Sequence, residues 1–114
     1  MIAVIFEVLP HPDRKGEYLD IAAELKPMVD EVEGFISVER FQSLTNPNKL
    51  LSLSFFADEG AVERWRKLSA HWRAQAKGRA GIFNNYHLRI AQVIRDYGMF
   101  DRDEAPIDSR RRHS

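Results

Sequence analysis

The amino-acid sequence predicts an α+β domain whose elements follow in the order β-α-β-β-α-β. Two observations support this prediction. Four short segments are rich in β-branched and aromatic residues, which is typical of strands, and two longer segments repeat their apolar residues at helical spacing. Four strands and two helices in this order are typical of a ferredoxin-like fold, in which a four-stranded antiparallel sheet carries both helices on one face.

Local sequence signals justify the individual elements. Pro27 lies inside the first helical pattern and is expected to kink that helix or to end its regular part. Asp13 and Asp58 are expected to cap the two helices. The turn sequence Asn46-Pro47-Asn48 predicts that the second and third strands form a hairpin. We expect strands over residues 2–9, 35–41, 49–56 and 86–94 and helices over residues 14–32 and 59–77.

The length of 114 residues is sufficient for one domain with one core. We assign residues 1–100 to this domain. Residues 101–114 are expected to form a C-terminal arm that docks on the domain and ends in a flexible tail, because the chain becomes polar after Tyr97 and carries three consecutive arginines at 110–112.

The charge and residue content exclude several classes of function. Seventeen basic residues balance seventeen acidic ones, so no global field favours nucleic acid or an anionic membrane as a partner. The absence of cysteine excludes disulfides and thiolate chemistry and fits a reducing compartment. No apolar stretch approaches the roughly 20 residues of a membrane helix, and the N-terminal run lacks signal-peptide features. We therefore expect a soluble, cytoplasmic protein.

The predicted sheet has apolar residues on both faces. The helix-facing set is expected to be Ile2, Val4, Phe6, Val8, Leu51, Leu53, Phe55, Leu88, Ile90 and Ile94. The opposite face is expected to mix Ala3, Ile5, Leu9, Leu50, Phe56, Ala91 and Val93 with Glu7, Ser52, Ser54, His87 and Arg89. This second face is too apolar to be left in water, and a two-fold axis needs only one self-complementary patch to cover it. The expectation is a homodimer joined through sheet faces, and the alternative is a monomer with a patchy outer face.

One face of the second helix indicates a pocket for a flat ligand. The residues that share this face are Ala61, Trp65, Leu68, Trp72 and Ala76, and Arg79 closes its end. Alanines between tryptophans leave room for an aromatic small molecule, and Phe6 on the facing side of the sheet is expected to contact it. The alternative is that both tryptophans are core packing.

A few polar side chains are candidates for chemistry. His71 lies at the margin of this helix face, where an imidazole can act as general base, proton shuttle or haem ligand, although a lone histidine is more often structural. Glu7, His87 and Arg89 share the second sheet face, where a carboxylate–guanidinium pair would be buried at the dimer interface. No metal site is expected, because the four histidines are scattered, and the P-loop, G-x-G-x-x-G and G-x-S-x-G motifs are absent.

A set of short motifs stands in a characteristic order: Gly34-Phe35, Trp65-Arg66, His71, Gln75 and Gly78-Arg79, followed by the final strand. This layout resembles the antibiotic biosynthesis monooxygenase (ABM) domain family over residues 1–97. The resemblance implies a dimer of ferredoxin-like chains whose sheets form a shared α/β barrel, with a pocket in each subunit between helices and sheet. It implies one of two activities: oxidation of phenolic or quinol-like substrates by O₂ without metal or flavin, or haem binding and degradation.

Some positions depart from the pattern of that family. Trp65 matches the pocket tryptophan of both branches. The aromatic-oxidising enzymes carry an asparagine one helical turn earlier, where this chain has Ala61. The haem-degrading enzymes use an asparagine on the first strand, where this chain has Phe6-Glu7, and place their haem-ligand histidine nearer Gln75 than His71.

These features predict a cofactor-independent monooxygenase acting on an aromatic small molecule. His71 would act as base, and Trp65 and Trp72 would form the stacking wall. Arg79 or Arg89 would stabilise a phenolate or peroxide. A haem-binding and haem-degrading monooxygenase is one alternative. A non-catalytic small-molecule-binding or stress-response module is another, because the chain has a single candidate base and lacks both family asparagines.

Overall fold

The computed structural model describes residues 1–75 and 82–108 of the chain, with side chains for residues 1–70 and 82–108. The elements are β1 (Ile2–Pro10), the short 3₁₀ helix η1 (Pro12–Arg14), α1 (Lys15–Asp30), β2 (Phe35–Gln42), β3 (Leu50–Phe56), α2 (Glu59–Gln75) and β4 (Phe83–Gln92). The predicted order β-α-β-β-α-β is therefore confirmed, with a 3₁₀ turn added before the first helix.

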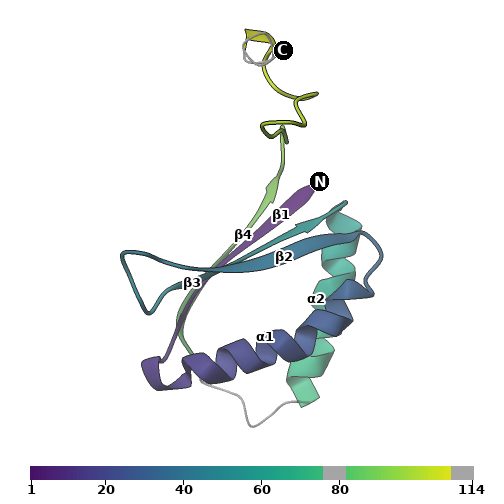
Figure 1. Cartoon of the computed structure of the whole chain (residues 1–114). Coiled ribbons are helices and arrows are strands. Elements are labelled where there is room, and N and C mark those ends of the chain that lie inside the picture. Colours follow the sequence, from purple (N-terminus) through teal and green to yellow (C-terminus); the bar gives the residue numbers. More distant parts are fainter. Residues whose placement is uncertain (76–81, 109–114) are drawn as a thin grey trace.

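The four strands form one sheet in the order β2-β3-β1-β4, and every neighbouring pair is antiparallel. Both helices lie on the same side of this curved sheet, with α1 running beneath the strands and α2 standing across its end (Figure 1). The ferredoxin-like architecture predicted from the sequence is the observed one. Among the described residues, no helix is long and apolar enough to cross a membrane.

The caps and turns follow the sequence signals in part. The backbone N–H of Ala61 donates to Asp58 Oδ1 at 2.8 Å, so Asp58 caps α2 as predicted. Asp13 instead lies within η1, and no side-chain hydrogen bond caps either η1 or α1. Pro27 lies inside α1, and the helix continues beyond it to Asp30. The Asn46–Asn48 turn joins β2 to β3, with Asn48 N–H donating to Asn46 Oδ1 at 3.0 Å.

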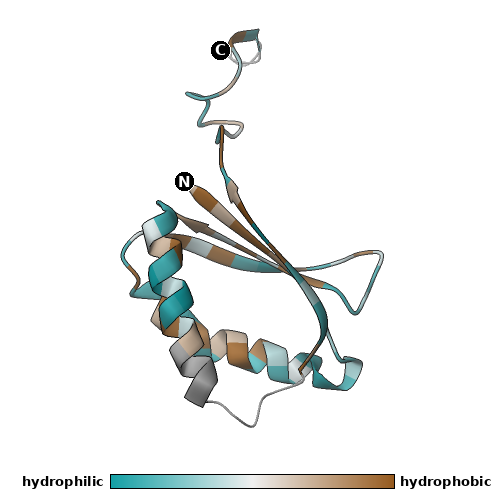
Figure 2. Ribbon diagram, turned by 180° about the vertical axis from the view of Figure 1, so that it is seen from behind, coloured by the Kyte–Doolittle hydropathy of each residue, from teal (hydrophilic) through white to brown (hydrophobic). Residues whose placement is uncertain are grey.

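α2 runs through Ser69 as one continuous helix. The Ser69 hydroxyl donates to the carbonyl oxygen of Arg66 at 3.2 Å, so this buried polar group is satisfied within its own helix. Bands of hydrophilic and hydrophobic residues alternate along α2, as expected of a helix with one covered side (Figure 2).

The predicted face assignment of β3 is wrong. Register pairs Ile5 with Leu53 and Phe6 with Ser52, and directly paired residues share a face. Leu51, Leu53 and Phe55 therefore lie on the face away from the helices, and Leu50, Ser52, Ser54 and Phe56 face the helices. Both faces of this central strand are covered or apolar, so hydrophobic alternation could not tell which one the helices take.

The core lies in two clusters at opposite ends of α1. One contains Val8, Tyr18, Leu50 and Ile82, and the other contains Val29, Phe56 and Ala61. These clusters hold the two ends of the helix against the sheet, and a hollow remains between them.

The last strand and the arm differ from the prediction. β4 starts at Phe83 and ends at Gln92, so Ile94 lies beyond the sheet and is 79% exposed. The arm that follows forms a compact loop, in which Gly98 N–H donates to the Asp101 carbonyl at 2.7 Å and Asp96 N–H donates to Glu104 Oε2 at 2.8 Å. Figure 1 shows this loop projecting away from the sheet, so it does not dock on its own domain as expected.

Candidate functional site

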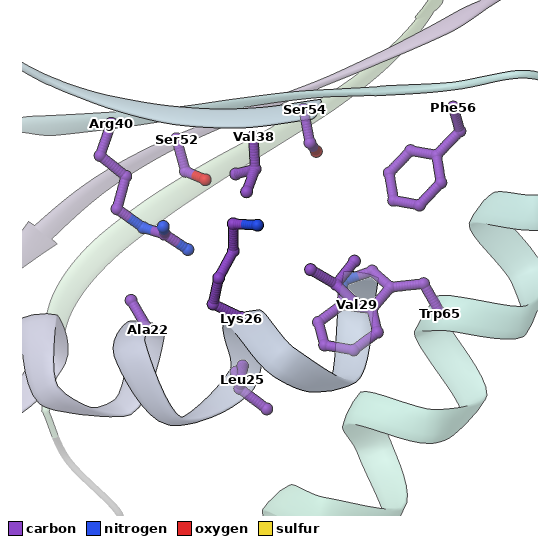
Figure 3. Close-up of a pocket in the computed structure, with 10 residues that line it drawn as sticks. All are labelled: Ala22, Leu25, Lys26, Val29, Val38, Arg40, Ser52, Ser54, Phe56 and Trp65. Carbon is purple, nitrogen blue, oxygen red and sulfur yellow. The ribbon is translucent and has the colours of Figure 1, made fainter. Parts of the chain in front are cut away.

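A cavity lies between α1, the helix-facing side of β2 and β3, and the first turns of α2. Its volume is about 60 Å³, and it is open to solvent at one side. The side chains that line it are Ala22, Leu25, Lys26, Val29, Val38, Arg40, Ser52, Ser54, Phe56 and Trp65 (Figure 3).

The cavity has a polar and an apolar end. Arg40 and Ser52 project from the sheet at one end, and Phe56 and Trp65 face Val29 of α1 at the other (Figure 3). Register places Arg40 directly opposite Ser52 on the neighbouring strand. A guanidinium and a hydroxyl are thus presented side by side to the same space.

Two hydrogen bonds anchor the first turns of α2, and this positions Trp65 at the cavity. Asp58 caps the helix, and Arg64 Nη2 donates to the carbonyl oxygen of Glu33 at 2.7 Å. Ala61, one turn before Trp65, is fully buried against Val29 and Phe56. Trp65 is half-buried, packs on the same cluster and lines the cavity.

The two cations at the cavity differ in their surroundings. Lys26 Nζ forms an ion pair with Asp30 one turn along α1, and it also lies 5.6 Å from the centre of the Phe35 ring. Arg40 Nε is inaccessible to solvent and has no hydrogen-bond partner among the described residues. Among the described side chains that line the cavity, none is a carboxylate.

Two of the predicted ligand contacts lie beside the cavity. The Phe6 ring packs on Phe83 at 5.9 Å and on Tyr86 at 5.6 Å between ring centres, within the cluster around Val8. Ala61 is buried in the other cluster and does not line the cavity. Both residues therefore serve packing in this structure, although Ala61 leaves the space into which Phe56 and Val29 fit.

Arg89 lies on the opposite face of the sheet from the cavity. Its Nη1 is 3.6 Å from Glu7 Oε2, and Lys49 Nζ is 3.3 Å from the same oxygen. The predicted carboxylate–guanidinium contact is thus present, with a lysine that was not anticipated. The hydrogen bond from Lys49, with a smaller contribution from Arg89, lowers the pKa of Glu7. This placement separates Arg89 from Trp65 by the thickness of the sheet.

The remaining predicted residues cannot be placed on the cavity. His71 and Trp72 belong to the last turns of α2, but their side chains lie outside the described residues, as does the whole of Arg79. Their assigned roles stay predictions. Across the described part of the chain, no group of three or more histidines, aspartates or glutamates lies close enough together to hold a metal ion.

The polar end of the cavity was not anticipated from the sequence. Arg40, Ser52 and Ser54 come from β2 and β3, and Lys26 comes from α1. One signal was available: Ser52 and Ser54 alternate with leucine and phenylalanine in a central strand, where small hydroxyls leave space that larger side chains would fill. The inverted face assignment of β3 placed these serines on the wrong side.

Comparisons with proteins of known sequence match this chain to one family. The family model for antibiotic biosynthesis monooxygenase matches residues 1–77. A jasmonate monooxygenase ABM of Pyricularia oryzae is 47% identical to this chain over 93 residues, which cover 82% of this chain and 43% of that relative. This chain therefore spans less than half the length of the relative.

Solved structures share the fold. Rv0793 from Mycobacterium tuberculosis superposes with a TM-score of 0.71 at 15% identity, covering 85% of this chain and 98% of that one. A MhuD variant with two manganese protoporphyrin IX molecules bound per active site superposes with a TM-score of 0.69 at 17% identity, covering 86% and 99%. At these identities the likeness shows the fold alone.

Proposed function

Because the chain belongs to the antibiotic biosynthesis monooxygenase family, we propose that it is a cytoplasmic monooxygenase that oxygenates an apolar, aromatic small molecule in the cavity beside Trp65. The observation that carries this proposal is the position of Trp65, whose half-buried indole forms a wall of the cavity together with Val29 and Phe56. An aromatic ring that enters there meets an indole face and aliphatic side chains, which favour a flat apolar ligand.

The proposed reaction needs no external reductant when the substrate is electron-rich. A ring methylene loses its two hydrogens, or a phenol loses one ring hydrogen and its hydroxyl hydrogen, and the carbon gains one oxygen atom as a carbonyl. The second oxygen atom of O₂ leaves with those two hydrogens as water. The substrate, once deprotonated, supplies all four electrons that reduce O₂, so the protein has to bind it, remove a proton and exclude water. His71 is the proposed base, and Arg79 is the proposed stabiliser of the anion.

The Pyricularia oryzae relative supports a monooxygenase reaction on a small molecule, since it is named for the oxygenation of jasmonate. Its identity of 47% to this chain extends over 93 residues, which cover 82% of the chain. The relative is more than twice as long as the matched region, so we propose the class of reaction and not its particular substrate.

We further propose that two chains associate through the sheet face away from the helices. With β3 assigned by its observed register, this face carries Ile5, Leu51, Leu53, Phe55 and Phe41 around the Glu7 ion pairs. None of these apolar side chains is fully buried in the single chain. A second copy would cover the patch with the same patch, and it would desolvate Glu7 together with its cationic partners.

The alternative function is haem binding. It is motivated by the solved MhuD structure of the same fold, which holds manganese protoporphyrin IX. The described side chains that line the cavity include no histidine, tyrosine, cysteine or methionine, so they supply no axial ligand for iron. The described residues thus do not fit haem. A Soret band that appears on addition of haemin, and that His71→Ala abolishes, would overturn this assessment.

Oxygen consumption by the purified chain with hydroquinones and anthrones tests the monooxygenase proposal. Trp65→Ala is expected to lower kcat/KM about tenfold or more, because stacking of roughly 1.4 kcal/mol is lost. Lys67→Ala, on the exposed side of the same helix and outside the cavity lining, is the control and should retain activity.

The same assay tests the proposed base. His71→Ala should lower kcat by about 100-fold while ligand binding is retained, and His87→Ala on the outer face should leave kcat unchanged. Binding of aromatic ligands without turnover of any of them would contradict the monooxygenase proposal and favour a non-catalytic binding module.

A further inference from the structure

We propose that the cavity recognises a carboxylate: Arg40, assisted by the Ser52 hydroxyl, holds the anionic end of an amphiphilic ligand whose apolar body lies against Val29, Phe56 and Trp65. This inference rests on the proposed function for the identity of the site, and it adds the chemical class of the ligand. It concerns binding and involves no chemical step of its own.

The first argument is the condition of the Arg40 guanidinium. Its Nε has no access to solvent and no hydrogen-bond partner among the described residues, and no ion pair of Arg40 occurs within them. Arg40 as a residue is only partly buried, but a buried N–H donor without an acceptor costs free energy, since its desolvation is offset only by an acceptor or by water. The guanidinium that lines the cavity thus lacks an acceptor at Nε among the described residues.

The second argument is the balance of charge around the cavity. Lys26 is already neutralised by Asp30, and both side chains are about half exposed at the mouth. None of the described lining side chains is acidic. Arg40 is thus the lining cation whose charge the described residues leave uncompensated, which matches a ligand with a single negative charge.

The third argument is geometry. Arg40 and Ser52 are directly paired across β2 and β3, and Val38 and Ser54 form the next pair on the same face. A guanidinium fork beside a hydroxyl offers parallel donors to the two oxygens of a planar carboxylate. Arg40 stands at the end of the cavity remote from Trp65, so the anionic and apolar parts of a ligand would separate along its length (Figure 3).

The size of the cavity agrees with this division. The enclosed 60 Å³ has room for a few water molecules or a carboxylate, because one ordered water needs roughly 10 to 15 Å³ of such space. The cavity is open to solvent at one side, so the apolar body of a ligand would extend out of the enclosed space. The ligand is therefore expected to be a small monocarboxylic acid with a compact apolar body.

Calorimetric binding of acids and their methyl esters tests the inference without turnover. The probes are jasmonate with methyl jasmonate and 2-naphthoate with methyl 2-naphthoate, so that each pair differs in charge and little in shape. The wild-type chain should bind at least one acid about 10- to 100-fold more tightly than its ester, and Arg40→Met should remove that preference. Arg40→Lys keeps the charge without the fork and should give an intermediate preference.

Arg66→Met is the matched control, since Arg66 is exposed, pairs with Glu63 on α2 and does not line the cavity. It should leave the acid–ester preference intact.

Equal binding of acid and ester, a preference that survives Arg40→Met, or no binding of any probe would overturn the inference. Acid binding that depends on Arg40, in a chain that consumes no O₂, would support carboxylate recognition and contradict the monooxygenase proposal. Turnover of esters with no binding of acids would support the monooxygenase proposal and contradict carboxylate recognition.

Discussion

Gly34 lies against Ala61, so closely that a Cβ atom added at Gly34 would stand 2.8 Å from the Ala61 Cβ. Gly34 has a φ of +90°, which side-chain-bearing residues rarely adopt, and its carbonyl accepts a hydrogen bond from Ala57 N–H at 2.7 Å. This contact joins the turn before β2 to the first turn of α2. Because Trp65 follows Ala61 by one helical turn, the contact between Gly34 and Ala61 also sets how closely Trp65 approaches the cavity.

Gly34→Ala is expected to lower the free energy of unfolding by about 2 to 4 kcal/mol. The substitution combines backbone strain at positive φ with overpacking against Ala61. Urea denaturation followed by circular dichroism measures the change. Gly16→Ala is the control, since nothing lies within 4 Å of the added Cβ in the first turn of α1, and it should be neutral or stabilising by up to about 1 kcal/mol. Equal effects at both positions would contradict the contact.

Glu7 should titrate below an unperturbed glutamate, with Lys49 as the main cause. The pKa of Glu7 is lowered first by the hydrogen bond from Lys49 and to a smaller extent by Arg89. In a carbon-detected NMR titration of the Glu7 carboxyl, its pKa should therefore rise more in Lys49→Met than in Arg89→Met. The reverse ranking would contradict the observed contacts.

The lowered pKa of Glu7 determines how the stability of the fold changes with pH. The folded-state pKa of Glu7 lies below its unfolded-state value. Its ion pairs therefore stabilise the fold at pH values above the unfolded pKa, and this contribution is lost as the pH falls through the folded pKa. Glu7→Gln should flatten that part of the acid-unfolding curve, and an unchanged curve would show that the pairs contribute nothing.

Leu53→Lys should convert the proposed homodimer into a monomer. Leu53 lies at the centre of the outer sheet face and pairs with Ile5 on one side and Glu39 on the other. A lysine there is solvated beside Glu39 in the single chain, but a two-fold interface would remove both charges from water. Sedimentation should show twice the 13.2 kDa chain mass for the wild type and 13.2 kDa for the variant.

The control for this prediction changes charge elsewhere on the surface. Lys67→Glu on the exposed side of α2 should leave the sedimenting mass unchanged. A wild-type chain that sediments at 13.2 kDa would contradict the association through the sheet.

The sequence was informative where a signal is local. Asp58 caps α2 and the Asn46–Asn48 turn closes the β2–β3 hairpin, because both depend on residues within a few positions of each other. Trp65 was placed on the inner side of its helix by spacing alone, and the structure places it on the cavity. Asp13 failed as a cap because a proline-initiated 3₁₀ turn takes its place ahead of α1.

By itself the sequence determined the order of elements, the fold and the inward side of α2, since hydrophobic periodicity and turn chemistry act over a few residues. The tertiary structure alone decided which face of β3 meets the helices, because strand register depends on pairing with β1 and β2 and a shift of one residue exchanges the faces. That register brings Arg40 beside Ser52 and moves Arg89 to the outer side with Glu7. The polar end of the cavity thus exists only when residues from separate strands are brought into register.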